Sequence, residues 1–504
     1  MASTSQTPVS NGPTSQHSAP PGACALFCLP YAGGDATAFW AWQSAFGASA
    51  RLEFITLPGR GRPAARPGEI GESGEIGEIG EISAQEIARE IAARVVSPYA
   101  IYGHSMGARL AFEVTRALIA LGAPPPVRIF VGAAHPPHLP EPLARIAHVT
   151  EDEFIDQLIL RAGAPEELRA DHDVRTALMP ALRTDLEWLK RYRYRHGEPL
   201  PVPIVAFAGT VDREVSGDVM LGWARHTSAW FRLHTITGGH LFLSTAGDVV
   251  ADLISAEVAT AVASNGSGPS PVATPAADEI HVWRASLDRM PRVCSAVDEL
   301  SPREQARSTA FRHDVDRRRY VGRCVLLRRL LRRYGADLGR REIPTGPHGK
   351  PYVQRPAGLR FSLSHSRGTL LVALAREQEI GVDVERLRPM VNFEAFCDGA
   401  LTNAENAEVA AEPEESQLLA GLRFWTAKEA VLKATGDGLG VEPTAFSFAN
   451  QPREGIWRPD PDPRVRYLAD WTVTRLDLDG AVGAIATTRI GWRLRYETAG
   501  ELSR

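Results

Sequence analysis

The stretch YGHSMGARLAFEV, residues 102–114, decides the fold of the first half of this chain. It contains the pattern G-x-S-x-G, which is typical of a sharp turn from a strand into a helix with an exposed serine. YAIY before the turn predicts a buried strand, and GARLAFEV after it has helical spacing. The start of that helix supplies backbone N–H groups for an oxyanion. Ser105 is therefore a candidate nucleophile, and the alternative is an ordinary tight turn.

The sequence around this turn alternates apolar runs with helical patterns. Six runs are expected to be buried parallel strands: residues 25–30, 52–58, 99–105, 127–134, 203–210 and 231–237. Helical spacing lies between them, as in AQEIAREIAARVV, residues 84–96. The alternation predicts an α/β doubly wound sheet. Residues 149–197 break it with a helix-rich segment that we expect to cap the sheet.

A serine nucleophile needs a base and an acid that orients the base. Asp212 follows the run PIVAFAGT and His240 follows the run FRLHTIT, so both are expected at the carboxyl edge of the sheet. Their order after Ser105 is the order found in this kind of fold. His104 is a rival base in sequence only, because a neighbour of the nucleophile points away from it.

The composition is that of an ordinary globular protein of two to four domains, with 504 residues, 44% hydrophobic and 23% charged. The net charge of −4 favours neither nucleic acid nor anionic membranes as partners. Five scattered cysteines and no long apolar run predict a cytoplasmic protein without disulfides. We expect a disordered tail over 1–22, one domain over 23–263, a Gly/Ser/Pro linker over 264–278 and a second domain over 279–504. The Gly-Glu-Ile repeat at 68–82 is expected to be a surface loop.

The second half has the pattern of an α+β domain. An Arg-rich region, residues 305–335, is expected to be one long helix. Strands are expected at 359–366, 369–376, 380–386, 471–478 and 481–488, and a helix at FWTAKEAVLKATGDGL, residues 424–439.

Acidic and basic side chains in this half predict a metal-bound phosphate site. Asp383 and Glu385 are two residues apart on a strand and share a face, and two hard carboxylates suit Mg²⁺. Glu429 and Lys433 share a face of the 424–439 helix. A carboxylate ligand beside a lysine is what a metal-bound diphosphate requires. The alternatives are an exposed acidic pair and a surface ion pair.

The first half resembles type II thioesterases, the editing hydrolases of polyketide and nonribosomal peptide assembly lines. The resemblance rests on LFCLPYAGGDATAFWAW, LPGRGRP, YGHSMGARLAFE and GGHLFL. It implies hydrolysis of acyl groups from carrier-bound phosphopantetheine thioesters, a helical lid, and an oxyanion hole formed by the backbone N–H groups of Ala32 and Met106. The residues alone leave a general esterase or acyltransferase open, and also a non-catalytic docking module.

The second half resembles the surfactin-type 4'-phosphopantetheinyl transferases through FRHDVDRRRYVGR, GPHGKPYV, FSLSHSRG, GVDVER and FWTAKEAVLKATGDGL. The resemblance implies a pseudo-dimer of two α+β halves with coenzyme A and Mg²⁺ between them. Asp383, Glu385 and Glu429 would bind Mg²⁺, and Lys433 would contact phosphate. The implied coenzyme A contacts are Arg307, Arg319, Lys350, Ser364 and His365.

The same resemblance places Glu405, in LTNAE, near the reacting hydroxyl, and it marks Glu304 as a departure from a basic residue. The implied partners are acyl and peptidyl carrier proteins, with no nucleic acid and no membrane. A basic docking surface for acidic carriers is expected near Arg328 and Arg329 on the Arg-rich helix.

Overall fold

The computed structural model describes residues 24–40, 42, 46, 50–57, 82–95, 98–142, 151–162, 166–263, 274–452, 456–489 and 492–498. The expected tail, most of the linker and nearly all of the Gly-Glu-Ile repeat lie outside these residues. None of the described helices has the length and apolar content needed to cross a membrane. All five cysteines are buried free thiols.

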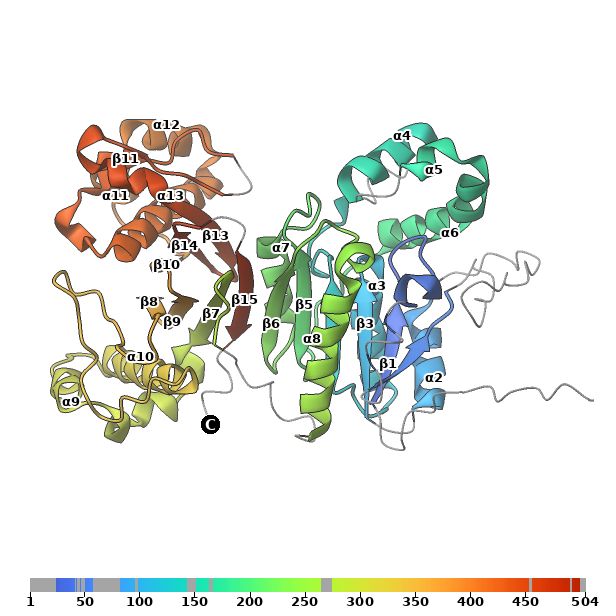
Figure 1. Cartoon of the computed structure of the whole chain (residues 1–504), viewed down its shortest axis with the longest axis horizontal. Coiled ribbons are helices and arrows are strands. Elements are labelled where there is room, and N and C mark those ends of the chain that lie inside the picture. The colour runs from blue at the N-terminus through green and yellow to red at the C-terminus, as the bar shows by residue number, and fades with distance from the viewer. Residues whose placement is uncertain are drawn as a thin grey trace, which may run out of the picture.

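A ten-stranded sheet runs through both halves of the chain, in the order β2-β1-β3-β4-β5-β6-β15-β7-β9-β8 (Figure 1). Its first six strands are parallel to one another. They are β1 (Cys24–Leu29), β2 (Ala50–Phe54), β3 (Tyr99–His104), β4 (Arg128–Gly132), β5 (Ile204–Gly209) and β6 (Phe231–Ile236). Five of them coincide with predicted apolar runs, because strands covered on both faces are apolar throughout. The edge strand β2 is half-exposed and overlaps its predicted run, residues 52–58, only over residues 52–54.

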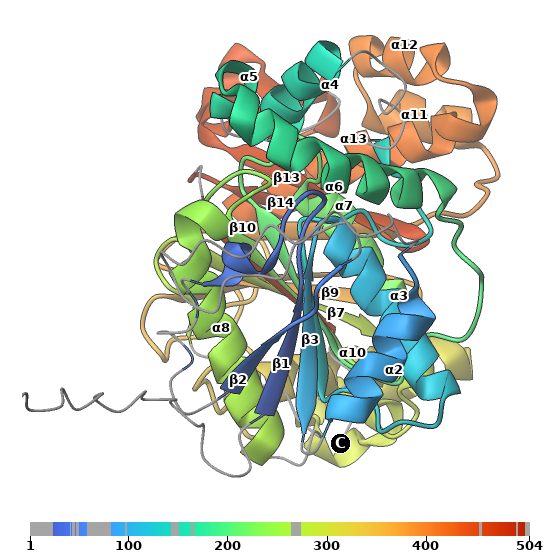
Figure 2. The ribbon, with the colours of Figure 1, turned by 90° about the vertical axis from the view of Figure 1, so that its right-hand side faces the viewer.

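Helices cover both faces of this parallel part (Figure 2). One face carries α2 (Ala84–Arg94) and α3 (Met106–Ala120), and the other carries α8 (Leu243–Ala263). The predicted cap is formed by α4 (Glu151–Gln157), the π-helical turn η3 (Leu158–Ala162), α5 (Glu167–Ala170) and α6 (His172–Arg191). It lies beyond the end of the sheet at which β1 and β3 finish (Figure 1).

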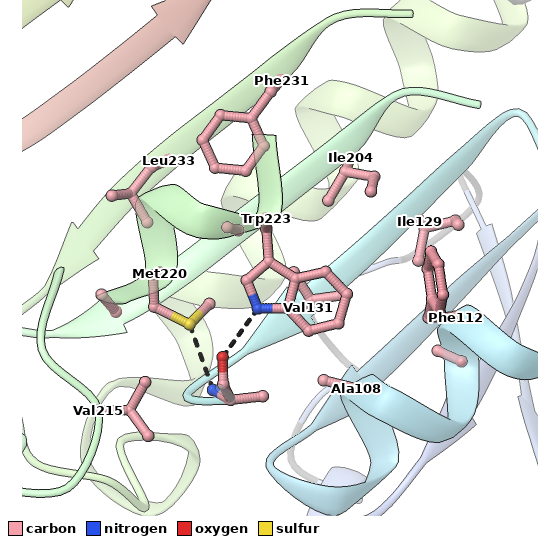
Figure 3. Packing of buried hydrophobic residues seen from close by; sticks show 14 of the residues in the cluster. Ala108, Phe112, Ile129, Val131, Ile204, Val215, Met220, Trp223, Phe231 and Leu233 are labelled. Atoms are coloured by element: carbon pink, nitrogen blue, oxygen red, sulfur yellow. Dashed lines mark hydrogen bonds between the residues drawn. The ribbon is translucent and has the colours of Figure 1, made fainter. Parts of the chain in front are cut away.

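A buried apolar cluster fixes the loop after β4. Trp223 Nε1 donates to the carbonyl oxygen of Ala134 at 2.8 Å, and the Ala134 N–H lies 3.2 Å from the sulfur of Met220 (Figure 3). Met220 lies in the last turn of α7 (Gly217–Leu221), and Trp223 lies in the 3₁₀ turn that follows, η4 (Gly222–His226). The segment after Asp212 is thereby held against the sheet.

The second half contributes four strands to the large sheet and a smaller sheet of its own. The four are β7 (Glu279–Ser286), β8 (Leu359–Ser366), β9 (Thr369–Arg376) and β15 (Arg493–Thr498). The smaller sheet has the order β10-β14-β13, with β10 (Ile380–Arg386), β13 (Thr472–Leu478) and β14 (Ala481–Thr487). The helices of the second half are α9 (Pro302–Thr309), α10 (Asp314–Arg333), α11 (Phe393–Ala400), α12 (Asn403–Ala411) and α13 (Glu414–Thr435). Short 3₁₀ turns precede α9 and follow α13, and the small pair β11 (Phe446–Ser447) and β12 (Asp460–Pro461) also follows α13.

The prediction of one long helix over 305–335 is wrong. The chain leaves helical geometry after α9 and enters α10 through His313, whose backbone is extended. Asp314 and Asp316 lie in the first turn of α10, where their charge favours a helix N-terminus.

The junction between the halves is a strand that the sequence reading did not predict. β15, close to the carboxyl terminus, lies antiparallel to β6 and parallel to β7. The Phe231 and Tyr496 rings meet edge to face at 6.2 Å, and the Phe231 N–H donates to Thr498 Oγ1 at 3.0 Å. One apolar core, containing Leu233 and Tyr496 together with Leu371 and Val382, crosses this junction. The two halves therefore share both a sheet and a core.

Candidate active sites

The turn between β3 and α3 has the geometry of a nucleophile elbow. Ser105 has φ 54° and ψ −116°, a strained combination for a residue with a side chain. A Cβ at Gly103 would collide with the carbonyl of Gly107, and one at Gly107 would collide with the carbonyl of Leu29. Both glycines of the motif are thus required by close backbone approach.

Ser105, His240 and Asp212 form a hydrogen-bonded chain. His240 Nε2 lies 3.0 Å from Ser105 Oγ, and His240 Nδ1 lies 3.0 Å from Asp212 Oδ2. The other carboxylate oxygen of Asp212 accepts from the N–H groups of Glu214 at 2.8 Å and Val215 at 3.0 Å. The three residues that the sequence predicted are brought together in the order nucleophile, base, orienting acid.

The charges around Ser105, His240 and Asp212 allow His240 to act as a base. Burial acts to lower the pKa of His240, but the hydrogen bond and charge of Asp212 raise it above its ordinary value. Burial acts to raise the pKa of Asp212, yet His240 and the two backbone N–H groups lower it overall. Asp212 therefore stays ionised and stabilises the imidazolium that forms when His240 takes the serine proton.

His104 has a structural place beside this chain. Its Nε2 lies 2.8 Å from the carbonyl oxygen of His240, and its Nδ1 lies 3.0 Å from the hydroxyl of Tyr102. Complete burial and the nearby His240 lower the pKa of His104 to about 3, so the ring is neutral. Its neutral Nε2–H donates to the backbone of His240, which agrees with the prediction that it packs rather than reacts.

The backbone N–H groups of Ala32 and Met106 have no acceptor among the described residues. Ala32 follows β1 and Met106 opens α3, and within the described residues neither N–H donates a hydrogen bond. These are the two oxyanion donors that the resemblance implied.

In the second half, a cavity of about 480 Å³ opens between β8, β10 and α13. It is lined by Arg323, Leu363, Ser364, His365, Asp383, Glu385, Trp425, Glu429 and Lys433. Most of the predicted metal and phosphate residues therefore meet in one cleft. Trp425 is half-buried and forms part of its wall.

Serines at alternate positions of β8 hold the carboxylates of β10. Ser364 Oγ donates to Asp383 Oδ1 at 2.7 Å, and Ser366 Oγ donates to Glu385 Oε2 at 2.7 Å. Ser362 Oγ accepts from the Val382 N–H at 3.1 Å. The sequence reading missed Ser366, although the period-2 pattern S-x-S-x-S in FSLSHS places all three serines on one face.

The carboxylates fit a hard divalent cation. Mainly because of burial and the neighbouring carboxylates, the pKa values of Glu385 and Glu429 are raised. Asp383 Oδ2 is buried and has no hydrogen-bond partner among the described residues. As they stand, no three such side chains in the described part of the chain are gathered closely enough to hold a metal. Lys433 Nζ instead lies 2.5 Å from Asp383 Oδ1 and 4.0 Å from Glu429 Oε2. We infer that the Lys433 ammonium supplies the positive charge that these clustered carboxylates require.

The basic side chains predicted to contact coenzyme A lie in three different parts of the second half. His365 lies in the cleft, where Arg323 Nη1 approaches its Nε2 to 2.8 Å. Lys350 lines a neighbouring cavity of about 350 Å³ and pairs with Glu379 at 2.6 Å. Arg319 pairs with Asp288 at 2.8 Å, and Arg307 lies over the Tyr320 ring at 5.7 Å.

Arg323 is a cleft residue that the sequence reading missed. Its guanidinium lies over the Tyr320 ring at 5.1 Å and contacts His365. The signal available was its position, because Arg323 is one helical turn after Arg319 and so shares that face of α10.

Glu405 does not reach the cleft, which corrects its predicted role at the reacting hydroxyl. It caps the start of α12 and accepts from the Phe448 N–H at 2.7 Å. Its carboxylate also pairs with Lys428 at 2.9 Å, and both side chains are 0% exposed. A fully buried ion pair cannot touch a carrier serine, so Glu405 is structural.

The docking role predicted for Arg328 is also wrong. Arg328 is buried and pairs with Glu304 at 2.8 Å, and it donates to the carbonyls of Gly339 and Arg341. Glu304, the departure noted in the sequence, thus neutralises an internal arginine and closes the capping box of α9 with Ser301.

The fold and sites define two classes: a serine hydrolase with an α/β fold, and an α+β unit with a carboxylate cleft. The thioesterase-domain family matches residues 25–258, and the 4'-phosphopantetheinyl transferase superfamily matches residues 379–476.

Three relatives support these matches. The gramicidin S biosynthesis protein GrsT of Aneurinibacillus migulanus is 34% identical over 43% of this chain and 82% of that protein. The thioesterase PikA5 of Streptomyces venezuelae is 30% identical over 45% and 78%. The 4'-phosphopantetheinyl transferase HetI of Nostoc sp. is 31% identical over 44% and 92%.

The chain belongs to the thioesterases through its first half and to the 4'-phosphopantetheinyl transferases through its second. It is a bifunctional enzyme, a thioester hydrolase and a phosphopantetheinyl transferase, whose partners are carrier proteins and whose transferase substrate is coenzyme A.

Proposed function

We propose that one molecule both installs and clears the phosphopantetheine arm of acyl and peptidyl carrier proteins in polyketide and nonribosomal peptide synthesis. The transferase half moves 4'-phosphopantetheine from coenzyme A to a carrier serine and releases 3',5'-ADP. The hydrolase half adds water to stalled acyl thioesters on that arm and releases the acid and the free thiol. The hydrogen-bonded chain Ser105–His240–Asp212 is the observation that carries the hydrolase assignment.

For the hydrolase, we propose Ser105 as nucleophile, His240 as base, Asp212 as orienting acid, and the N–H groups of Ala32 and Met106 as the oxyanion hole. Their support is the geometry and the two unused donors described above. His240 returns its proton to the leaving thiol, and a water molecule then attacks the acyl-serine.

For the transferase, we propose that Asp383, Glu385 and Glu429 hold Mg²⁺. Bound there, the ion would neutralise charge on the pyrophosphate of coenzyme A. Lys433 then leaves Asp383 and contacts phosphate, while Ser364 and Ser366 keep the carboxylates aimed into the cleft. His365, Arg323, Lys350, Arg319 and Arg307 supply further contacts to coenzyme A.

We propose that residues 23–263 carry the hydrolase activity and residues 279–504 carry the transferase activity. Among the described elements of the second range, the strand β15 is the one that also belongs structurally to the first. β15 is continuous in sequence with the transferase half but pairs with β6 of the hydrolase half.

Intact-mass spectrometry of a carrier protein tests the combined function. An apo carrier, Mg²⁺ and acetyl-coenzyme A are incubated with wild type, Ser105→Ala and Glu429→Ala. We expect holo carrier from wild type, acetyl-carrier from Ser105→Ala and apo carrier from Glu429→Ala. An apo carrier with wild type would contradict the transferase assignment. Equal turnover of free short esters and carrier thioesters would favour a general esterase.

A further inference from the structure

The helical cap over the sheet, here called the lid, is joined by a hydrogen bond to the loop that contains Ala32. The backbone N–H of Gly33 donates to Asp185 Oδ2 at 2.7 Å, across 152 residues of chain. Asp185 lies on α6, the long lid helix, and its side chain is fully buried. Gly33 is the residue directly after Ala32.

The loop from Tyr31 to Gly34 is a tight turn in which the two N–H groups after Ala32 have acceptors. The Gly34 N–H donates to the Tyr31 carbonyl at 2.9 Å. Asp35 then begins the 3₁₀ turn η1 (Ala36–Phe39) by accepting from the Thr37 N–H at 2.9 Å. Gly33 donates to Asp185 and Gly34 donates within the turn, whereas the N–H of Ala32 donates to no described residue and stays available for a ligand.

Helix α6 also packs on this turn through apolar side chains. Gly33 has φ +77°, and a Cβ there would lie 3.1 Å from Leu178 Cδ1 and 3.3 Å from Leu182 Cδ1. The left-handed backbone and the absence of a side chain therefore let the helix come down onto the loop. The carboxylate of Asp185 fixes where it stops.

We propose that Asp185 is a positioning residue for thioester hydrolysis: it holds the Gly33 N–H and so aims the neighbouring Ala32 N–H at the oxyanion. This rests on the proposed role of Ala32. It also makes seating of the lid helix and completion of the oxyanion hole a single event. The N–H donors of an oxyanion hole stabilise the transition state only when they are already aligned. Loss of the Asp185 hydrogen bond should therefore lower kcat rather than raise KM.

The test compares hydrolysis of an acetyl-carrier by wild type, Asp185→Ala and Asp185→Asn. Asparagine keeps an oxygen acceptor of the same reach, whereas alanine removes it. Since a lost oxyanion donor costs about 10²–10³-fold, we expect kcat to fall about 100-fold in Asp185→Ala with KM within about twofold. The Asn variant should stay within about fivefold of wild type. Glu187→Ala, on the exposed side of the same helix, is the matched control and should be unchanged.

Two measurements keep the test independent of folding. Exhaustive labelling of Ser105 by a fluorophosphonate counts intact sites, so kcat is expressed per labelled site, and carrier loading by the other half reports the integrity of the molecule. If Asp185→Ala does not fold, Gly33→Ala replaces it, because it pushes the loop off α6 while leaving the carboxylate in place. It too should lose kcat at unchanged KM.

Unchanged kcat in the alanine variants would overturn the proposal, and so would equal losses in Asp185→Ala and Asp185→Asn. Failure of the proposed function looks different. In that case wild type itself would not hydrolyse the acetyl-carrier, or Ser105→Ala would still do so.

Discussion

Arg232 Nη2 on β6 lies 3.1 Å from Glu497 Oε2 on β15, although the two residues are 265 positions apart and belong to different enzymes. Both side chains are nearly inaccessible, at 1% and 4% exposure. Arg232 also pairs with Glu257 of α8, and Glu497 pairs with Arg495 at 2.6 Å. The junction is thus a buried, neutralised network between paired strands.

We predict that Glu497→Ala destabilises both enzymes together, because it leaves a buried guanidinium without one of its partners. Breaking such a pair costs about 3–5 kcal/mol. In a thermal series, hydrolysis and loading should be lost at the same lowered temperature. Asp314→Ala, which removes an exposed carboxylate, is the control. Loss of loading alone would mean that the halves unfold separately.

The raised pKa of His240 predicts the acid limb of hydrolysis. The base must be neutral, so kcat/KM should fall as pH drops through a value above about 6.5, the ordinary value for histidine. Asp212→Asn removes the group that raises this pKa. The limb should then move to lower pH, and kcat should fall by about 10³–10⁴-fold. Loading by the same molecule is the control. A limb that stays in place would contradict the role of Asp212.

Chelation should separate the two activities. EDTA is expected to abolish carrier loading and leave thioester hydrolysis intact, because only the carboxylate cleft needs a cation. Since the pKa values of Glu385 and Glu429 are raised, protons compete with Mg²⁺ at a higher pH than for ordinary glutamates. The Mg²⁺ concentration for half-maximal loading should therefore rise as pH falls. Loading that survives exhaustive chelation would exclude the site.

Glu405→Gln should affect stability rather than chemistry. The change leaves Lys428 buried beside a neutral amide, with an expected loss of about 3–5 kcal/mol in urea unfolding. The loading rate per folded molecule should be unchanged. Asp398→Ala, an exposed carboxylate on α11, is the control. Slow loading by a fully stable variant would instead restore Glu405 to the reacting site.

Local patterns in the sequence predicted most of what is local in the structure. Ser105 in its elbow and the Asp383–Glu385 pair follow from spacing on one turn and one strand. Glu405 and Arg328 were misplaced because a charged residue's burial depends on partners far along the chain, Lys428 and Glu304. β15 escaped for a related reason: its six residues pair with strands more than 200 positions away.

The unbroken sheet from β2 to β8 also sets how a carrier protein meets the two enzymes. The hydrolase site stands on this sheet and the loading cleft borders its last strand, β8, so the sheet fixes the separation and orientation of the two sites and provides no hinge between them. The carrier must dissociate and bind again, or its phosphopantetheine arm must span the distance between the two sites. Each transferase is nevertheless covalently linked to one hydrolase. The local concentration of hydrolase around a newly loaded carrier therefore depends on the geometry of the molecule and not on expression level.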